Sequence, residues 1–432
     1  MDSMHTRRIF LARGLTILSA ASTLPAFIQR TAEALNNPAD SPLTQTAAGR
    51  GDDRILVIVQ LGGGNDGLST VIPVDNDDYR NARPTLAVTQ NLLDLGGGSG
   101  LALHPNMQGF KSLYDAGELS IVLGAGYPNP NRSHFRSTEI WQTADPVNID
   151  STGWMGRYFD AECSGQDPIK SETAISIGSL SPLTLKGNIF QPTALQNPEN
   201  FQWLAGEGWG KQPAALRKTY QLLNGINPPC QLCANAGLNF LQRTALDAEL
   251  SGRDIRAATE NHQNAVSYPN SQFANSLSMV AKMIIANMPT RVYYVSISGF
   301  DTHAAQQRTH DNLMTDLSDG LTAFIKDLKA SGNLDRTLVF TFSEFGRRVA
   351  ENASAGTDHG TAAPMFLFGG SIKPGLIGTQ PSLAPGDLTM GDLKFTTDFR
   401  SVYAGILQDW LGAKQTTDIL DGQFKAASMV RT

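Results

Sequence analysis

The apolar positions of this chain fall into two patterns that alternate along it. Apolar runs without polar alternation are typical of strands buried on both faces, as in a parallel sheet. They lie at 54–61, 119–124, 291–297 and 337–342. Helical patterns are predicted around them, at 106–116, 238–260, 272–288, 310–330 and 397–411, the last with Thr397 or Asp398 as its N-cap. Because strands and helices alternate, the sequence predicts an α/β fold with a doubly wound, mostly parallel sheet.

Two stretches interrupt this alternation. Residues 150–235 show no clear periodicity and are rich in Gly, Pro, Asn and Ser, so we interpret them as a loop-rich insertion over one edge of the sheet. Residues 35–53 are polar and rich in Pro and Gly, which is typical of a linker. The prediction is therefore a single large α/β domain over 54–432, with the insertion at about 150–235.

The first 34 residues have the order of an export signal. Arg7 and Arg8 precede Ile9-Phe10-Leu11, which resembles the twin-arginine (Tat) signal, and residues 14–28 carry no charge. Such a run is too short to span about 30 Å of hydrocarbon, but it suits the apolar region of a signal peptide. We therefore expect export by the Tat translocase to the periplasm or the medium, removal of a signal within 1–34, and no stable membrane span in the mature form.

Composition narrows the class of protein. The 432 residues are 41% hydrophobic and 17% charged, which excludes a disordered chain, a coiled coil and a polytopic membrane protein. The formal net charge of −6 gives no basic footprint for a nucleic-acid partner. Cys230 and Cys233 form a C-x-x-C pair, which favours a local disulfide in an oxidising compartment and leaves a redox pair as the alternative. Cys163 is expected to be a free, buried thiol.

Polar clusters follow the predicted strands, at the edge where open α/β sheets bind ligands. Carboxylates with imidazoles suit zinc or manganese, and carboxylates alone suit calcium or magnesium. We expect one or two such divalent ions on a set of acidic and histidine residues: Asp66, Asp301, His303, Glu344, Asp358 and His359. Asp301 and His303 are two residues apart, so they point to the same side of an extended chain. The alternative is a set of structural polar networks at the bases of the loops.

The segment after the second strand, GYPNPNRSHFR, offers a nucleophile and an anion clamp. Ser133 and His134 supply a hydroxyl and an imidazole, and a Ser hydroxyl needs a metal or a base to activate it. Arg132 and Arg136 supply guanidinium forks that match phosphate or sulfate. We assign these four residues to catalysis, with Ser133 as the nucleophile. The alternative is a Pro-rich turn whose arginines form surface salt bridges.

A series of motifs runs in a fixed order over residues 54–412: GGGNDGLST, LHPNM, GYPNPNRSHFRS, GWMGRYFD, GFDTH, TFSEFGRRVAEN, GTDHGTAAPMFLFGG and LKFTTDFRSVY. The series resembles the Tat-exported "domain of unknown function 1501" family, which is similar in turn to the alkaline phosphatase/sulfatase superfamily. This resemblance implies an alkaline-phosphatase-like α/β fold, two bound metal ions and transfer of phosphoryl or sulfuryl groups.

The resemblance also implies roles for single residues. Asp66 looks like the first metal aspartate, Asp301 with His303 is similar to an aspartate–histidine pair, and His359 resembles the last metal histidine. Phe345 stands where a histidine is expected. Pro128 stands where sulfatases carry the cysteine precursor of formylglycine, so a formylglycine sulfatase is not expected.

Two classes of function follow. The first is an exported metal-dependent hydrolase of phosphate or sulfate esters that acts on a small ester substrate. The alternative is a non-catalytic exported binding or assembly factor on a degenerate alkaline-phosphatase-like fold, with a cell-surface ligand.

Overall fold

The computed structural model describes residues 53–162, 171–196, 252 and 254–431. The export signal, the linker up to residue 52 and all three cysteines lie outside the described residues. Of the helix expected at 238–260, the described part is helical over 254–261. Among the described residues, no helix combines the length and the apolar content that crossing a membrane requires.

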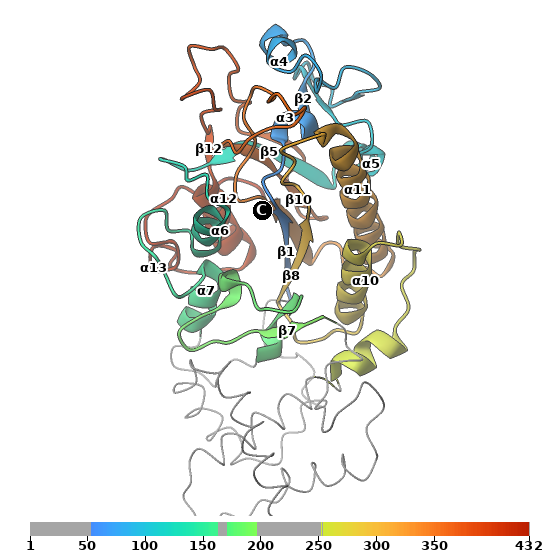
Figure 1. Ribbon diagram of the computed structural model, residues 1–432. Coiled ribbons are helices and arrows are strands. Elements are labelled where there is room, and N and C mark those ends of the chain that lie inside the picture. Colours follow the sequence, from blue (N-terminus) through green and yellow to red (C-terminus); the bar gives the residue numbers. More distant parts are fainter. Residues whose placement is uncertain (1–52, 163–170, 197–251, 253, 432) are drawn as a thin grey trace, which may run out of the picture.

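A nine-stranded sheet forms the centre of the described fold (Figure 1). Its strands run in the order β11-β5-β10-β9-β1-β8-β6-β7, with β12 beside the end of β5. The bounds are β1 Ile55–Gly62, β5 Leu119–Gly126, β6 Ala174–Ile177, β7 Thr193–Leu195, β8 Val292–Ser298, β9 Thr337–Phe342, β10 Ala363–Phe368, β11 Gly375–Ile377 and β12 Thr397–Asp398. Every pair of neighbours is parallel except the two pairs that β10 makes with β5 and β9. The prediction of an α/β fold with a mostly parallel sheet is confirmed.

The apolar run of β1 follows from its place between β8 and β9. Val57 and Val59 pack into the core on one face of the sheet, and Leu56 and Ile58 pack into the core on the other. Because successive side chains point to opposite faces, a strand covered on both sides must be apolar throughout.

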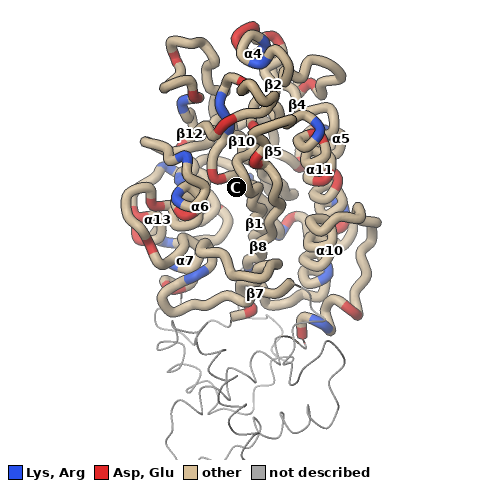
Figure 2. Tube along the Cα trace, in the orientation of Figure 1, with Lys and Arg blue, Asp and Glu red and all other residues tan. Residues whose placement is uncertain are grey.

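Helices cover both faces of the sheet (Figure 1). One layer consists of α5 Gln108–Asp115, α10 Gln272–Ile285 and α11 Gln306–Ala330. The other consists of α6 His134–Thr143, α7 Trp154–Glu162, α12 Phe399–Gly405 with a π-helical segment at Ile406–Trp410, and α13 Thr417–Leu420. Of the two predicted N-cap residues, Asp398 caps α12, because its side chain accepts a hydrogen bond from the Arg400 N–H. Figure 2 shows the charged residues on the helices and loops around a largely uncharged sheet.

Three parts of the fold were not predicted. Strand β10 enters the sheet antiparallel, and β6 and β7, from the region expected to be a loop-rich insertion, lengthen the sheet beyond β8. A small antiparallel sheet of β2 Val71–Pro73, β3 Leu93–Asp94 and β4 Leu101–Leu103 follows α3 Gly67–Thr70 and surrounds α4 Asp77–Ala82 in the sequence. Short 3-10 turns lie at Ser171–Thr173 and Leu183–Leu185.

Candidate metal centre

Three imidazoles and one carboxylate meet at the carboxyl edge of the parallel strands. His134 begins α6 after β5, Asp301 and His303 follow β8, and His359 precedes the antiparallel β10. The ligand atoms of His134, Asp301 and His359 lie within 4.8 Å of one another. His303 Nε2 lies 3.1 Å from Asp301 Oδ1 and 2.9 Å from His359 Nε2. We call these four residues the His/Asp cluster.

Each imidazole of the cluster is held from behind through Nδ1. The partners are the Glu344 carboxylate for His134 (2.9 Å), the Asp358 carboxylate for His303 (3.0 Å) and the Arg132 carbonyl for His359 (2.8 Å). All three partners are acceptors, so each Nδ1 carries the proton that it donates. The lone pair of each neutral ring is therefore on Nε2, which faces the cluster. This arrangement is typical of histidines that bind a metal ion.

The contact between His303 Nε2 and His359 Nε2 demands a cation. At 2.9 Å two lone pairs face each other, and with both Nδ1 protons already placed, only an added proton or a metal ion makes the approach favourable. Burial lowers the pKa of His359 below its usual value, although the Arg132 carbonyl and Asp301 oppose this shift. His134 Nε2 is buried and has no hydrogen-bond partner in the described part of the chain, and it lies 3.5 Å from Asp301 Oδ2. These observations fit a metal ion better than a proton.

Arg347 keeps the carboxylate of the cluster ionised. Its Nη2 lies 2.6 Å from Asp301 Oδ1. Partial burial opposes ionisation of Asp301, but the hydrogen bond and the charge of Arg347 outweigh it and lower the pKa of Asp301 to about 2. Because Arg347 contacts Oδ1, Oδ2 is left facing His134.

Arg347 also joins the loops around the cluster. Its buried guanidinium donates to the carbonyls of Gly63, Gly64, Phe300 and Thr357. Gly64 has φ 83°, and a Cβ there would lie 2.5 Å from the Phe345 ring, so the close approach requires glycine. The motif TFSEFGRR contains Arg347, but no signal in the sequence separates this buried arginine from its neighbour Arg348.

The predicted metal ligands fall into three groups: those in the cluster, those behind its imidazoles, and Asp66, which lies elsewhere. Asp301, His303 and His359 meet in the cluster, and His134, which we assigned to catalysis, joins them. The carboxylates of Glu344 and Asp358 lie behind the imidazoles and accept from their Nδ1 atoms.

Asp66 lies apart from the cluster, in a buried ion pair. Arg83 contacts both of its carboxylate oxygens, at 2.6 and 2.8 Å, and Ser69 and Gln306 also donate to it. Burial opposes ionisation, but the charge and hydrogen bonds of Arg83 outweigh it and hold the pKa of Asp66 well below its usual range. The guanidinium of Arg83 thus supplies the positive charge that Asp66 faces.

The predicted catalytic arginines are both engaged with other partners. Arg132 forms an ion pair with the buried Asp392. Arg136 contacts Glu139 at 3.0 Å and donates to the carbonyl of Asn148 at 2.7 Å. Ser133 is exposed at the N-cap position of α6, directly before His134. Of the four, only His134 is part of the cluster, and Ser133 precedes it in the sequence.

Phe345 forms an apolar wall beside the imidazoles. Its ring centroid lies 4.9 Å from that of His134 and 4.6 Å from that of His359. The phenyl ring therefore occupies space next to two of the ligands and offers no donor atom.

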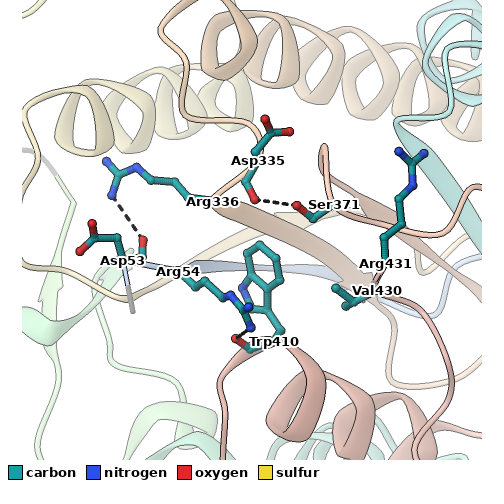
Figure 3. A pocket seen from close by; sticks show the side chains of 8 residues that line it. All are labelled: Asp53, Arg54, Asp335, Arg336, Ser371, Trp410, Val430 and Arg431. Atoms are coloured by element: carbon teal, nitrogen blue, oxygen red, sulfur yellow. Dashed lines mark hydrogen bonds between the residues drawn. The ribbon is translucent and has the colours of Figure 1, made fainter. Parts of the chain in front are cut away.

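Two cavities are formed by described residues outside the His/Asp cluster. One, of about 340 Å³, is at the amino ends of β1 and β9 and is lined by Asp53, Arg54, Asp335, Arg336, Ser371, Trp410, Val430 and Arg431 (Figure 3). The other, of about 350 Å³, is lined by Thr85, Leu86, Ala305, Gln307, Arg308, Asp311 and Ala355. Neither includes a residue of the His/Asp cluster.

The fold and the cluster define an α/β protein with a candidate metal centre at the carboxyl edge of its sheet. A sequence profile described as "Protein of unknown function (DUF1501)" matches residues 125–420, and the chain belongs to this family. No curated protein sequence matches the chain.

The chain is similar to several solved structures. The lipoteichoic acid synthase LtaP from Listeria monocytogenes is 10% identical, with 88% of this chain and 76% of that chain covered at a TM-score of 0.39. The PsFucS1 sulfatase from Pseudoalteromonas sp. is 11% identical, with 94% and 77% covered at a TM-score of 0.38. A protein in the alkaline phosphatase superfamily from Vibrio parahaemolyticus is 12% identical, with 77% and 63% covered at a TM-score of 0.32. All three TM-scores are below 0.5, so these likenesses carry no argument about the site or the activity of this chain.

Proposed function

We propose that the protein is an exported hydrolase of phosphate or sulfate esters that works with a metal ion bound by the His/Asp cluster. The observation that carries the proposal is that three imidazoles direct Nε2 at Asp301, while the Nδ1 proton of each ring is donated to an acceptor. Asp66, the other expected ligand, already faces Arg83, so the proposal has one ion.

The donor set fits zinc, with manganese as the second choice, because it offers three imidazole nitrogens and one carboxylate oxygen. A bound ion would act as a Lewis acid on the phosphoryl or sulfuryl oxygen of the ester. The protein's own contribution is to hold the ligands ready. Glu344, Asp358 and the Arg132 carbonyl fix the imidazole tautomers, and Arg347 keeps Asp301 charged.

Ser133 is the attacking group in this proposal. Its hydroxyl is exposed and directly precedes the ligand His134. In the first half-reaction Ser133 Oγ bonds to phosphorus or sulfur, the bond to the ester oxygen breaks, and the Ser133 hydroxyl proton passes to that oxygen, so the alcohol leaves. A water oxygen then bonds to phosphorus or sulfur, the bond to Ser133 Oγ breaks, and one proton of that water restores the Ser133 hydroxyl, so ester and water give alcohol and inorganic phosphate or sulfate.

The first turn of α6 supports anion binding beside the cluster. The N-terminus of a helix carries partial positive charge and unpaired N–H groups, which favour phosphate or sulfate. Arg132 and Arg136 have acid or carbonyl partners and would have to exchange them to hold the ester. Export rests on residues 1–34, outside the described residues.

The test begins with metal analysis of the chain lacking residues 1–34, followed by turnover of p-nitrophenyl phosphate and p-nitrophenyl sulfate. We expect one zinc or manganese per chain and hydrolysis of one ester. His303→Ala and His359→Ala should lose both metal and turnover. His262→Ala is the matched control, because His262 contacts the Ala258 carbonyl away from the cluster. Ser133→Ala should keep the metal and lose turnover.

The outcomes separate the two classes of function. Failure to bind zinc or manganese would overturn the proposal. Metal binding that needs His303 and His359 but gives no turnover of either ester would favour the alternative, a non-catalytic exported binding or assembly factor. Full turnover by Ser133→Ala would remove Ser133 from the reaction and keep the metal site.

A further inference from the structure

Two arginines beside the His/Asp cluster share one buried carboxylate. Asp392 is fully buried, its Oδ2 contacts Nη2 of Arg132, and its Oδ1 lies 3.3 Å from Nε of Arg348. Each arginine side chain stays about one-third exposed, at 35% for Arg132 and 36% for Arg348. Two positive charges face one negative charge, so the group has a net charge of +1. We call Arg132 and Arg348 the arginine pair.

A tight turn of the chain presents Asp392 to the arginine pair. Thr389 and Asp392 exchange two backbone hydrogen bonds of 3.0 Å, and Met390 and Gly391 between them have φ 52° and 85°. Two such residues in succession are typical of a two-residue hairpin turn. The carbonyl of Met390 accepts a hydrogen bond from Nη2 of Arg348, and a Cβ at Gly391 would lie 3.2 Å from that atom. The turn therefore fixes the guanidinium of Arg348 as well as the position of the carboxylate.

The backbone of the arginine pair is tied to two residues of the metal centre. The Arg132 carbonyl accepts from Nδ1 of His359 at 2.8 Å, and the Arg348 N–H donates to the Asp358 carbonyl at 3.0 Å. The hydrogen bond from His303 lowers the pKa of Asp358, and the charge of Arg348 lowers it further. Among the described residues, no hydrogen bond or ion pair joins either guanidinium to a ligand of the cluster. The pair thus lies beside the site of the proposed reaction and not within it.

The arginine pair supplies more positive charge than its buried carboxylate needs. At Asp66 a single arginine, Arg83, contacts both carboxylate oxygens and is itself buried. At Asp392 a second arginine is present, although Oδ1 has no hydrogen bond in the described part of the chain. Within that part, side-chain contacts engage only Nη2 of Arg132 and Nε and Nη2 of Arg348.

The donors left on the arginine pair suit an anion. A guanidinium carries several N–H donors in a planar fork, which matches the oxygens of carboxylate, phosphate and sulfate. Nη1 of both arginines is left for such a ligand by the contacts to Asp392 and Met390. Reaching the cluster would require Arg132 to leave Asp392, but an anionic group beside the cluster can be bound where the pair stands.

We propose that Arg132 and Arg348 bind a second anionic group of the substrate, carried on the alcohol part of the ester whose phosphate or sulfate reacts at the His/Asp cluster. The substrate class is then an ester with a second acidic group, a carboxylate or a further phosphate or sulfate. This inference rests on the proposed function for the reaction at the cluster. Binding of the second anionic group by the arginine pair does not itself require turnover.

The first test compares esters that differ only in the second group. The chain lacking residues 1–34 is assayed with hexyl phosphate, 6-phosphooxyhexanoate and hexane-1,6-diyl bisphosphate, and with the butyl series as a shorter spacer. The corresponding sulfates are used if the sulfate ester is the one that reacts. We expect kcat/KM at least ten-fold higher for an ester with a second anionic group, mainly through a lower KM. The better of the carboxylate and the bisphosphate identifies the second group.

Substitutions in the arginine pair and its carboxylate should change this preference in opposite directions. Arg348→Gln should lower the preference about ten-fold, because it removes a charged donor. Asp392→Asn should raise it roughly two- to five-fold, because it removes the competing carboxylate and keeps both arginines. Arg80→Gln is the matched control, since Arg80 pairs with Asp77 and the Val74 carbonyl, and it should leave the preference unchanged. A purely structural ion pair would give two less stable variants with the wild-type preference.

A binding measurement separates this inference from the proposed hydrolase. Calorimetry compares 6-phosphonohexanoate with hexylphosphonate, whose carbon–phosphorus bonds are not hydrolysed. Turnover without a preference for the second anionic group, or a preference unchanged in both Arg348→Gln and Asp392→Asn, would overturn the inference and keep the hydrolase. Tighter binding of 6-phosphonohexanoate that depends on Arg348, with no turnover of any ester, would uphold the anion site and overturn the hydrolase. Equal binding of the two phosphonates with no turnover would overturn both.

Discussion

Two networks at the carboxyl edge of the sheet use an aspartate in opposite ways. The first network consists of Asp66 and its partners Arg83, Ser69 and Gln306, and we call it the closed network. In it, Asp66 is fully buried and both of its oxygens contact Arg83. In the His/Asp cluster, Asp301 is half-exposed, and Arg347 contacts only Oδ1. A carboxylate after a buried strand is therefore a candidate ligand only where one oxygen is left without a cation.

The histidines of the two networks differ in the same sense. His310 is buried close to Asp66, and burial lowers its pKa to about 4, against the opposing charge of Asp66. Its Nε2 has no hydrogen-bond partner among the described residues. His359 is also kept neutral by burial, but its Nδ1 is anchored on the Arg132 carbonyl and its Nε2 faces Asp301. Both networks contain a neutral imidazole. Only in the His/Asp cluster does its Nε2 face a carboxylate together with other imidazoles.

The largest expected effect is on the closed network. Arg83→Ala leaves Asp66 buried and charged without its cation, so the free energy of unfolding should fall by about 3–5 kcal/mol. Urea denaturation of the metal-free protein measures this. Arg80→Ala, which removes exposed ion pairs to Asp75 and Asp77 and an exposed hydrogen bond to the Val74 carbonyl, should cost less than about 1 kcal/mol. Equal costs for the two variants would contradict the contrast between Asp66 and Asp301.

The second largest effect is a loss of stability at low pH that depends on His310. The folded pKa of His310, about 4, lies below its unfolded value of 6.5, so the unfolded chain binds the extra proton between these values. Stability is then constant above about pH 6.5 and falls as the pH drops towards 4, by roughly 3 kcal/mol in all. Unfolding measured across this range should show the loss. His310→Leu should flatten it, and His262→Leu, as the control, should retain it.

The fold was predictable where a strand is buried on both faces. The runs that became β1, β5, β8 and β9 are apolar almost throughout, because helices cover both sides of the sheet at these strands. The antiparallel direction of strand β10 was not predicted, because its six residues carry no local signal for the direction in which a strand runs in the sheet.

The sequence allowed the residue types of the site to be predicted, but not which side chains contact one another. Asp301, His303 and His359 could be proposed because they follow or precede strands at the same edge. That Asp66 pairs with Arg83 could not, because Arg83 lies in no motif and the pairing depends on both side chains being buried together. The role of His134 depends on Glu344, which is 210 residues away.

The smallest expected effect tests how the cluster holds its ligands. Glu344→Gln keeps an oxygen that can accept from the Gly63 N–H and from His134 Nδ1, but removes the negative charge behind the imidazole. Metal affinity should fall by roughly 10–100-fold, as expected for a residue that orients a ligand. Competition with a chelating dye measures this. Glu351→Gln is the matched control, because Glu351 is a partly exposed glutamate that accepts from Thr85 and Leu86, and it should leave metal affinity unchanged. An unchanged affinity in Glu344→Gln would mean that the negative charge behind His134 contributes nothing to metal binding.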